Sequence, residues 1–211
     1  MSTSADSILT VPLRRSLVAR AQAILLRPRV EWPVIAEEQA TTASLYAGYI
    51  APLAAIPPLA GLIGMSVFGL QLPYGGSYRT PLGAAITSAV VQYLLGLGMV
   101  YLLARIIEAL APSFGGQPDR LQALKVSAYS STASWLVGIV ALVPALGILS
   151  ILGLYSLYLI CLGLPPLMRA PPERAAAYAG TVIACAIGLV VVTGTIASRF
   201  IAYPSLLLPV R

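Results

Sequence analysis

Residues 39–78 read QATTASLYAGYIAPLAAIPPLAGLIGMSVFGLQLPYGGSY, and none of their side chains is charged. About 20 predominantly apolar residues are enough for a helix to cross the hydrocarbon core of a bilayer. The stretch therefore predicts a membrane-spanning helix. Charged residues make up 9% of the chain and apolar residues 58%, whereas soluble domains carry about 25% charged residues. We expect an all-α, polytopic membrane bundle.

The hydropathy pattern predicts about five transmembrane helices. The first span, at residues 45–70, contains Pro52, Pro57 and Pro58, so we expect it to be kinked and its freed carbonyl groups to be covered by neighbouring helices. The third is short and polar at its start, and a turn at Pro144 and Gly147 separates it from the fourth. In a four-span alternative, the third and fourth stretches form a re-entrant pair. The later spans are predicted at 82–104, 128–143, 148–168 and 177–198.

Residues 1–44 are polar and basic, and we expect a cytoplasmic or interfacial segment there, followed by the transmembrane domain at 45–200 and a short tail at 201–211. Apolar residues at helical spacing predict an amphipathic surface helix over 12–26, ended by Pro28, with the stem of Arg20 snorkelling at its edge. Trp32 and Pro33 are predicted to form an interfacial turn, because Trp prefers headgroup depth. A second short helix through residues 37–39 would lead into the membrane. No signal peptide is recognised, so the first span is expected to direct insertion.

Charge placement predicts the orientation. With five spans, the N-terminal segment and the loops at 105–127 and 169–176 share one side and carry ten Arg and Lys residues, against Arg79, Arg199 and Arg211 on the other side. By the positive-inside rule, the N-terminus is cytoplasmic and the C-terminus lies outside. We expect a cell inner membrane, because the preference for Arg over Lys indicates a bacterial source. The net charge of +6 favours contact with anionic headgroups over nucleic acid.

A row of small residues on the fifth span predicts close helix packing. Small side chains at every fourth position let two helix backbones approach each other in lipid. Packing within the chain and packing between copies in a homo-oligomer both remain open, with Ala60 and Gly64, and Ser134 and Gly138, as weaker pairs of the same kind. The row consists of Ala176, Gly180, Ala184 and Gly188.

Polar side chains within the spans are candidates for a polar cavity. Gln92 needs a hydrogen-bond partner in the bilayer, and we expect a Ser or Thr at the start of the third span. Tyr155 and Tyr158 share a helix face. Arg105 and Glu108 are spaced to pair at the end of the second span. The candidate cavity residues are Gln92, Tyr129, Ser130, Tyr155 and Tyr158.

The sequence lacks the side chains that most catalytic and metal sites use. It has no His, and its clustered acids are Glu31, Glu37 and Glu38. Cys161 and Cys185 sit in apolar stretches without disulfide or metal-ligand spacing. We therefore expect no catalytic residue, no metal and no cofactor.

Three motifs in order carry a family resemblance. They are Leu-Leu-Arg-Pro28 with Glu31-Trp-Pro-Val-Ile35, then Ala128-Tyr-Ser130, then residues 153–168 followed by Arg-Ala-Pro-Pro-Glu-Arg. The pattern resembles the Yip family of integral membrane proteins, especially its short bacterial branch, over residues 20–200. The resemblance implies five spans and a cytoplasmic N-terminus. Its motif residues here are Pro28, Trp32, Gly163 and Pro165, of which Gly163 and Pro165 are expected to end the fourth helix.

Three functions follow as hypotheses. The first is a non-enzymatic membrane protein that associates with copies of itself or with other membrane proteins. The second is a transporter or channel component whose polar cavity is lined by the broken first span and Gln92. The third is an intramembrane lipid-modifying enzyme. Eukaryotic relatives in the resembling family bind small GTPases, but this chain lacks their long cytosolic tail, so we do not extend GTPase binding to it.

Overall fold

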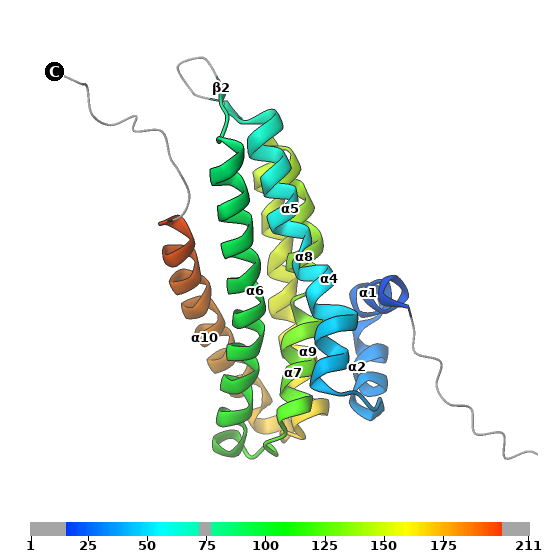
Figure 1. The fold of residues 1–211 in the computed structure, drawn as a ribbon. Coiled ribbons are helices and arrows are strands. Elements are labelled where there is room, and N and C mark those ends of the chain that lie inside the picture. Colours follow the sequence, from blue (N-terminus) through cyan, green and yellow to red (C-terminus); the bar gives the residue numbers. More distant parts are fainter. Residues whose placement is uncertain (1–15, 72–76, 200–211) are drawn as a thin grey trace, which may run out of the picture.

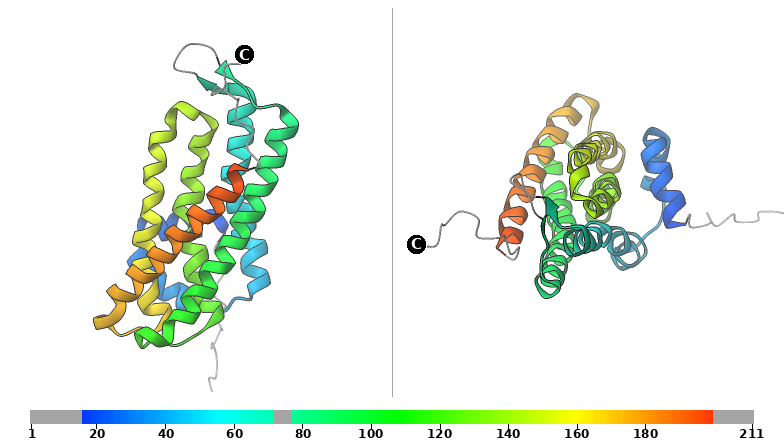
Figure 2. Two further views of the ribbon diagram at one scale, coloured as in Figure 1. Left: turned by 90° about the vertical axis from the view of Figure 1, so that its left-hand side faces the viewer. Right: turned by 90° about the horizontal axis from the view of Figure 1, so that it is seen from above.

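The computed structural model describes residues 16–71 and 77–199, which form a helical bundle with one short pair of strands (Figure 1). Seen from above, α10 (Pro172–Ser198) lies on one side of the bundle and α1 (Leu17–Leu26) on the opposite side (Figure 2). The predicted all-α class is confirmed.

The helix predicted over 12–26 is α1, whose first described residues are capped by the hydroxyl of Ser16, which accepts from the backbone N–H of Ala19. Residues 12–15 lie outside the described part of the chain. The prediction that Arg20 snorkels at the edge of the apolar face is wrong. Arg20 is turned into the protein with Ala21 and Ile24, because the buried carboxylate of Glu31 pairs with it there.

The predicted turn at Trp32 and Pro33 and the predicted helix through 37–39 are both wrong. Trp32 and Pro33 lie inside α2 (Pro28–Glu37). This helix begins at Pro28, where the missing N–H of proline costs no intrahelical hydrogen bond. Trp32 is 1% exposed, because its indole is enclosed by protein. An apolar pattern does not distinguish the protein interior from headgroup depth.

The first span is one helical stretch from Thr42 to Phe68. The π-helical segment before Pro52 and a turn at Ala55, before Pro57, accommodate the prolines, since a widened or interrupted ladder does not need the missing N–H groups. Gly138 covers the bend so closely that a Cβ added there would lie 2.5 Å from Cγ of Pro57. The kink and its covering are confirmed. The segments are α3 (Thr42–Leu45), η1 (Tyr46–Ile50), α4 (Ala51–Ala54), α5 (Ile56–Ile63) and η2 (Gly64–Phe68).

Strands β1 (Leu70–Gln71) and β2 (Ser77–Tyr78) pair antiparallel and lead into α6 (Leu82–Leu110). This helix continues beyond the predicted end at residue 104 and closes in η3 (Ala111–Phe114). Gly115 follows with φ of 75°, a left-handed conformation that glycine adopts without steric cost.

The third helical stretch begins earlier than predicted, at α7 (Arg120–Ser130), and continues through α8 (Thr132–Val137) and η4 (Gly138–Leu142). Asp119 caps α7 by accepting from the N–H groups of Leu121 and Gln122. Every residue from Ala123 to Ser130 is buried, Lys125 included. Hydropathy missed this start because α7 is enclosed by protein, and its polar side chains are satisfied there.

The fourth stretch consists of η5 (Pro144–Leu154) and α9 (Tyr155–Met168). The prediction that Gly163 and Pro165 end it is wrong, because α9 continues to Met168 and turns at Arg169, whose φ is 49°. Pro165 removes one ladder hydrogen bond, but the buried side chains of Leu164 and Leu167 hold the helix in the bundle. The fifth stretch, α10, starts at Pro172, before its predicted start at 177.

Four described stretches are long and apolar enough to cross a membrane, namely Thr42–Phe68, Leu82–Phe114, Ala145–Met168 and Pro172–Ser198. The stretch over 120–142 is about 34 Å long at the α-helical rise, enough to cross, but it is too polar in its first half to qualify. It runs along the bundle beside α6 and α9 (Figure 1). By length and composition, the described residues therefore supply four candidate membrane spans, one fewer than the five predicted. The fourth helical stretch is long and apolar enough to cross by itself.

Candidate functional site

Charged side chains from separate parts of the chain converge where α1 and α2 meet the bundle. Arg20 donates through Nη1 to Oε1 of Glu31 and through Nη2 to Oε2 of Glu38. Arg20 is 5% and Glu31 3% exposed. A guanidinium removed from water costs several kcal/mol unless it is paired, and the planar fork of Arg suits two carboxylates. The pairing therefore holds α1 against α2 and against the chain that enters the first span.

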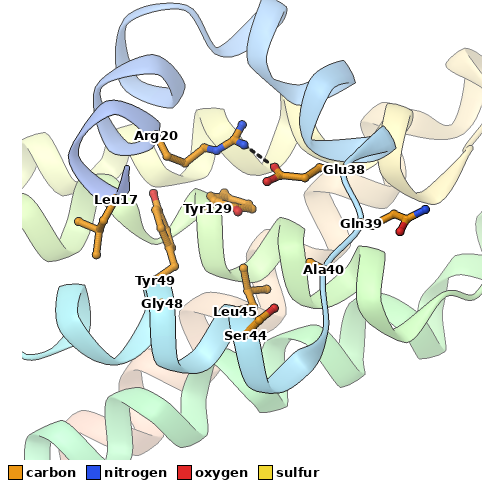
Figure 3. Close-up of a pocket in the computed structure, with 10 residues that line it drawn as sticks. All are labelled: Leu17, Arg20, Glu38, Gln39, Ala40, Ser44, Leu45, Gly48, Tyr49 and Tyr129. Carbon is orange, nitrogen blue, oxygen red and sulfur yellow. Dashed lines mark hydrogen bonds and ion pairs between the residues drawn. The ribbon is translucent and has the colours of Figure 1, made fainter. Parts of the chain in front are cut away.

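The aromatic rings of Tyr49 and Tyr129 lie next to Arg20 (Figure 3). Its Cζ lies 5.8 Å from the ring centroid of Tyr129 in α7, within reach of a cation–π interaction. The Tyr129 ring packs on Tyr49, with centroids 4.6 Å apart, and meets Trp32 edge-on at 6.4 Å. The hydroxyl of Tyr49 bonds to that of Thr132 at 2.7 Å. These contacts join the N-terminal helices, the first span and α7 in one cluster.

Lys125 of α7 forms hydrogen bonds with the backbone at the C-terminal end of α2. Its Nζ donates to the backbone carbonyls of Ile35 at 2.8 Å and Glu38 at 2.6 Å, and Nε2 of Gln122 donates to the carbonyl of Ala36 at 2.9 Å. The last carbonyls of a helix have no intrahelical partner, so these side chains satisfy them. Burial lowers the pKa of Lys125 below its usual value, against the opposing effect of the Glu38 and Asp119 carboxylates.

A small polar cavity of about 150 Å³ lies beside this cluster (Figure 3). Its walls include Arg20 and Glu38 from the N-terminal segment, Ser44 and Tyr49 from the first span, and Tyr129 from α7. Both terminal nitrogens of the Arg20 guanidinium are already bound to carboxylates. The cavity therefore lies where several elements meet, and its walls have little unpaired charge with which to bind a ligand. Among the described residues, no three His, Cys, Asp or Glu side chains gather closely enough to hold a metal ion.

The five predicted cavity residues lie in different surroundings. Nε2 of Gln92 donates to Oγ of Ser88, one turn earlier on α6, so its predicted partner on the third span is wrong. The hydroxyl of Tyr155 donates to the carbonyl of Leu25, and its ring lies 5.3 Å from that of Tyr158, which is 41% exposed. Tyr129 lines the cavity of Figure 3, whereas Ser130 lines a separate groove on the other side of α7.

The row of small residues on α10 faces away from the bundle. All four of its members are exposed, and a Cβ added at Gly180 or Gly188 would meet no atom within 4 Å. The opposite face of α10 does the packing, through Tyr178, Val182 and Ala186. Packing of the row within the described chain is therefore not observed. The row is Ala176, Gly180, Ala184 and Gly188.

The four family-motif residues act structurally. Pro28 starts α2, and Trp32 lies against the backbone of Gly163 in α9, two residues before Pro165. Within the described part of the chain, the buried Nε1 of Trp32 finds no hydrogen-bond acceptor. The predicted pair of Arg105 and Glu108 is confirmed at 2.8 Å and is partly exposed at the end of α6.

The cluster around Arg20 was not predicted from the sequence. Glu31 and Glu38 are two of only seven acids, and Lys125 is the single lysine of the chain. Charges so rare in a membrane protein are costly to retain unless they are paired. That scarcity is the one feature of the sequence that could have singled them out, although it does not say which residues meet.

A sequence model of the Yip1 domain matches residues 23–193. The chain belongs to the Yip1 family. The matched range contains Glu31, Glu38 and Lys125 and begins just after Arg20. Together with the apolar helices, membership identifies this Yip1-family chain as a multi-pass integral membrane protein.

This Yip1-family chain is similar to a protein of Escherichia coli strain K12 named inner membrane protein YohC. The two are 26% identical over 161 residues, which cover 74% of this chain and 83% of the relative. The protein of the same name from Escherichia coli O6:H1 matches equally well, at 26% identity over 161 residues. No solved structure matches the chain.

Proposed function

We propose that this Yip1-family protein is a non-enzymatic protein of the bacterial inner membrane that acts by associating with other membrane helices. The observation that carries the proposal is the outward orientation of the small-residue row on α10. All four residues are exposed, while Tyr178 and Val182 on the opposite face pack in the bundle. In lipid, such a face lets a second helix approach closely enough for van der Waals packing to hold the pair.

The partner is a second copy of the chain or another membrane protein. Gly180 and Gly188 have no neighbouring atom within 4 Å of an added Cβ, so a second backbone has free access to them. The inner-membrane location is supported by the name of the Escherichia coli relatives. Exposed arginines such as Arg27, Arg29 and Arg174 support contact with anionic headgroups on the cytoplasmic side. The excess of basic residues around the N-terminal segment supports a cytoplasmic N-terminus.

The transporter hypothesis is weaker. It needs the first span, Gln92 and the hydroxyl-bearing residues around one polar cavity, but Gln92 bonds within its own helix and Tyr155 bonds to the carbonyl of Leu25. A lipid-modifying enzyme would need an accessible acid or base. Glu31 and Glu38 are bound to Arg20, and the exposed Glu37 forms no ion pair with a basic side chain within the described part of the chain.

The test is crosslinking of the full chain in native membranes. Gly180→Leu and Gly188→Leu are expected to reduce the crosslinked oligomer by about tenfold, because a leucine at either position separates the helix backbones. Gly98→Leu is the matched control, since Gly98 is exposed on α6 and also has no neighbour within 4 Å. If no crosslinked species forms with the wild-type chain, or if all three variants behave alike, the proposal fails.

A further inference from the structure

A groove of about 530 Å³ opens at the middle depth of the bundle, separate from the cluster around Arg20. It passes Gly96, the central residue of α6, and this places it among the membrane-spanning helices. α10 packs along α6 and α9, while its upper half leans away from the turn between η4 and η5 (Figure 2). The walls include Gly96, Met99, Trp135, Leu157, Val190 and Val191.

Four of the five serine hydroxyls along the groove are hydrogen-bonded within the protein. Ser134 and Ser156 bond to each other through their hydroxyls at 2.9 Å. The hydroxyl of Ser130 donates to the carbonyl of Val126 at 2.6 Å, and that of Ser131 to the carbonyl of Ser127 at 2.8 Å. These four hydroxyls are therefore satisfied by the protein, and apart from Ser150 the remaining lining side chains are apolar or aromatic.

Two apolar occupants of the groove, a helix from a second copy and a lipid acyl chain, differ in size. One turn of an α-helix, about 10 Å across and 5.4 Å tall, fills about 400 Å³. The groove holds little more than one such turn, so a helix from a second copy would be seated in it over only about one turn. An acyl chain is slender enough to lie in the groove, whose volume falls in the range of about 300–1,000 Å³ typical of small-molecule sites. Phospholipid is the surrounding medium at this depth.

We propose that this groove binds one acyl chain of a membrane phospholipid, between α6, α8 and the upper half of α10. The site is independent of the association proposed for the small-residue row, because that row needs a second protein and this groove needs only the bilayer.

Photolabelling in vesicles tests the proposal. The full chain is placed in vesicles of phosphatidylethanolamine and phosphatidylglycerol that contain a phosphatidylethanolamine with a diazirine near the end of one acyl chain. After irradiation, mass spectrometry locates the labelled residues. We expect labelling at Met99 and Trp135, in the groove, to exceed labelling at the exposed Leu94 and Ile139 by at least about threefold. Equal labelling of groove and exposed surface overturns the proposal.

Two phenylalanine substitutions on α6 separate filling of the groove from a change in the helix. Gly96 lines the groove and an added Cβ meets no atom within 4 Å, so Gly96→Phe fills the groove without a backbone clash. It should lower labelling of Trp135 by about threefold, whereas Gly98→Phe, outside the groove, should not. Ile187→Trp fills the groove from α10 and should act like Gly96→Phe. Unchanged labelling in both filling variants overturns the proposal, as does preferential labelling by a diazirine fatty acid added free.

Discussion

The indole of Trp32 in α2 lies so close to the backbone of Gly163 in α9 that a Cβ added at residue 163 would fall 2.7 Å from Cζ2 of the ring. Both residues belong to motifs that mark the family. The contact is a close approach of one ring to one helix backbone, and only glycine permits it. The contact fixes the N-terminal helices to α9, in the fourth helical stretch of the bundle.

Gly163→Ala should separate α2 from α9. The methyl group overlaps three atoms of the indole, which cannot bend away, and overpacking of this kind costs about 1–3 kcal/mol. Unfolding in a denaturing detergent measures the loss of stability. Gly98→Ala, where no atom crowds the added methyl, should be neutral or slightly stabilising because alanine favours helix over glycine. Equal stability of the two variants would contradict the packing argument.

Arg20→Met should cost about 3–5 kcal/mol, because it leaves the buried carboxylate of Glu31 without its guanidinium. The same unfolding assay measures the cost, and proteolysis should show the segment before Thr42 becoming accessible. Arg105→Met is the matched control. It removes an arginine whose pair with Glu108 is partly exposed, and should cost about 0–1 kcal/mol. A similar small loss in both variants would mean that the Arg20 cluster adds little to docking.

Lys125 should make stability depend on alkaline pH. Burial lowers its folded-state pKa below the value of 10.5 that applies to the unfolded chain, so the unfolded state binds more protons in the window below 10.5. The free energy of unfolding therefore rises as pH is raised through that window. A neutral amine still carries donors for the carbonyls of Ile35 and Glu38. Measured between about pH 8 and 10, Lys125→Met should be less stable and should lack this rise. Parallel pH profiles for the two proteins would refute the assignment.

Cysteine labelling should establish the orientation. In a chain with Cys161 and Cys185 replaced by Ser, Arg79→Cys lies between the first two spans and Gln117→Cys between the second and third helical stretches. Intact spheroplasts treated with a membrane-impermeant maleimide should label residue 79 and not residue 117, which should react only after lysis. The reverse pattern would invert the topology, and labelling of both sites in intact cells would contradict a membrane crossing by α6.

Apolar length and spacing predicted the spanning stretches well, because both are local properties of the chain. The kink of the first span could be foreseen from Pro52, Pro57 and Pro58, and the pairing of Arg105 with Glu108 from their spacing. The start of the third helical stretch, at α7, could not be foreseen. Lys125 and the serines of α7 have the hydropathy of a loop, and only enclosure by α6, α9 and the N-terminal segment makes them interior residues.

The all-helical membrane class could be read from the chain alone, because a charge-free run such as 39–78 is long and apolar enough to cross a bilayer. Which charges are interior and which helix faces are free depends on the folded bundle. Arg20 follows the pattern of a surface residue, yet it is buried, because Glu31 and Glu38 neutralise it. Gly180 and Gly188 fit a packing face, yet they lie outside, because Tyr178 and Val182 occupy the bundle. Burial depends on partners that are distant along the chain, and no local pattern records them.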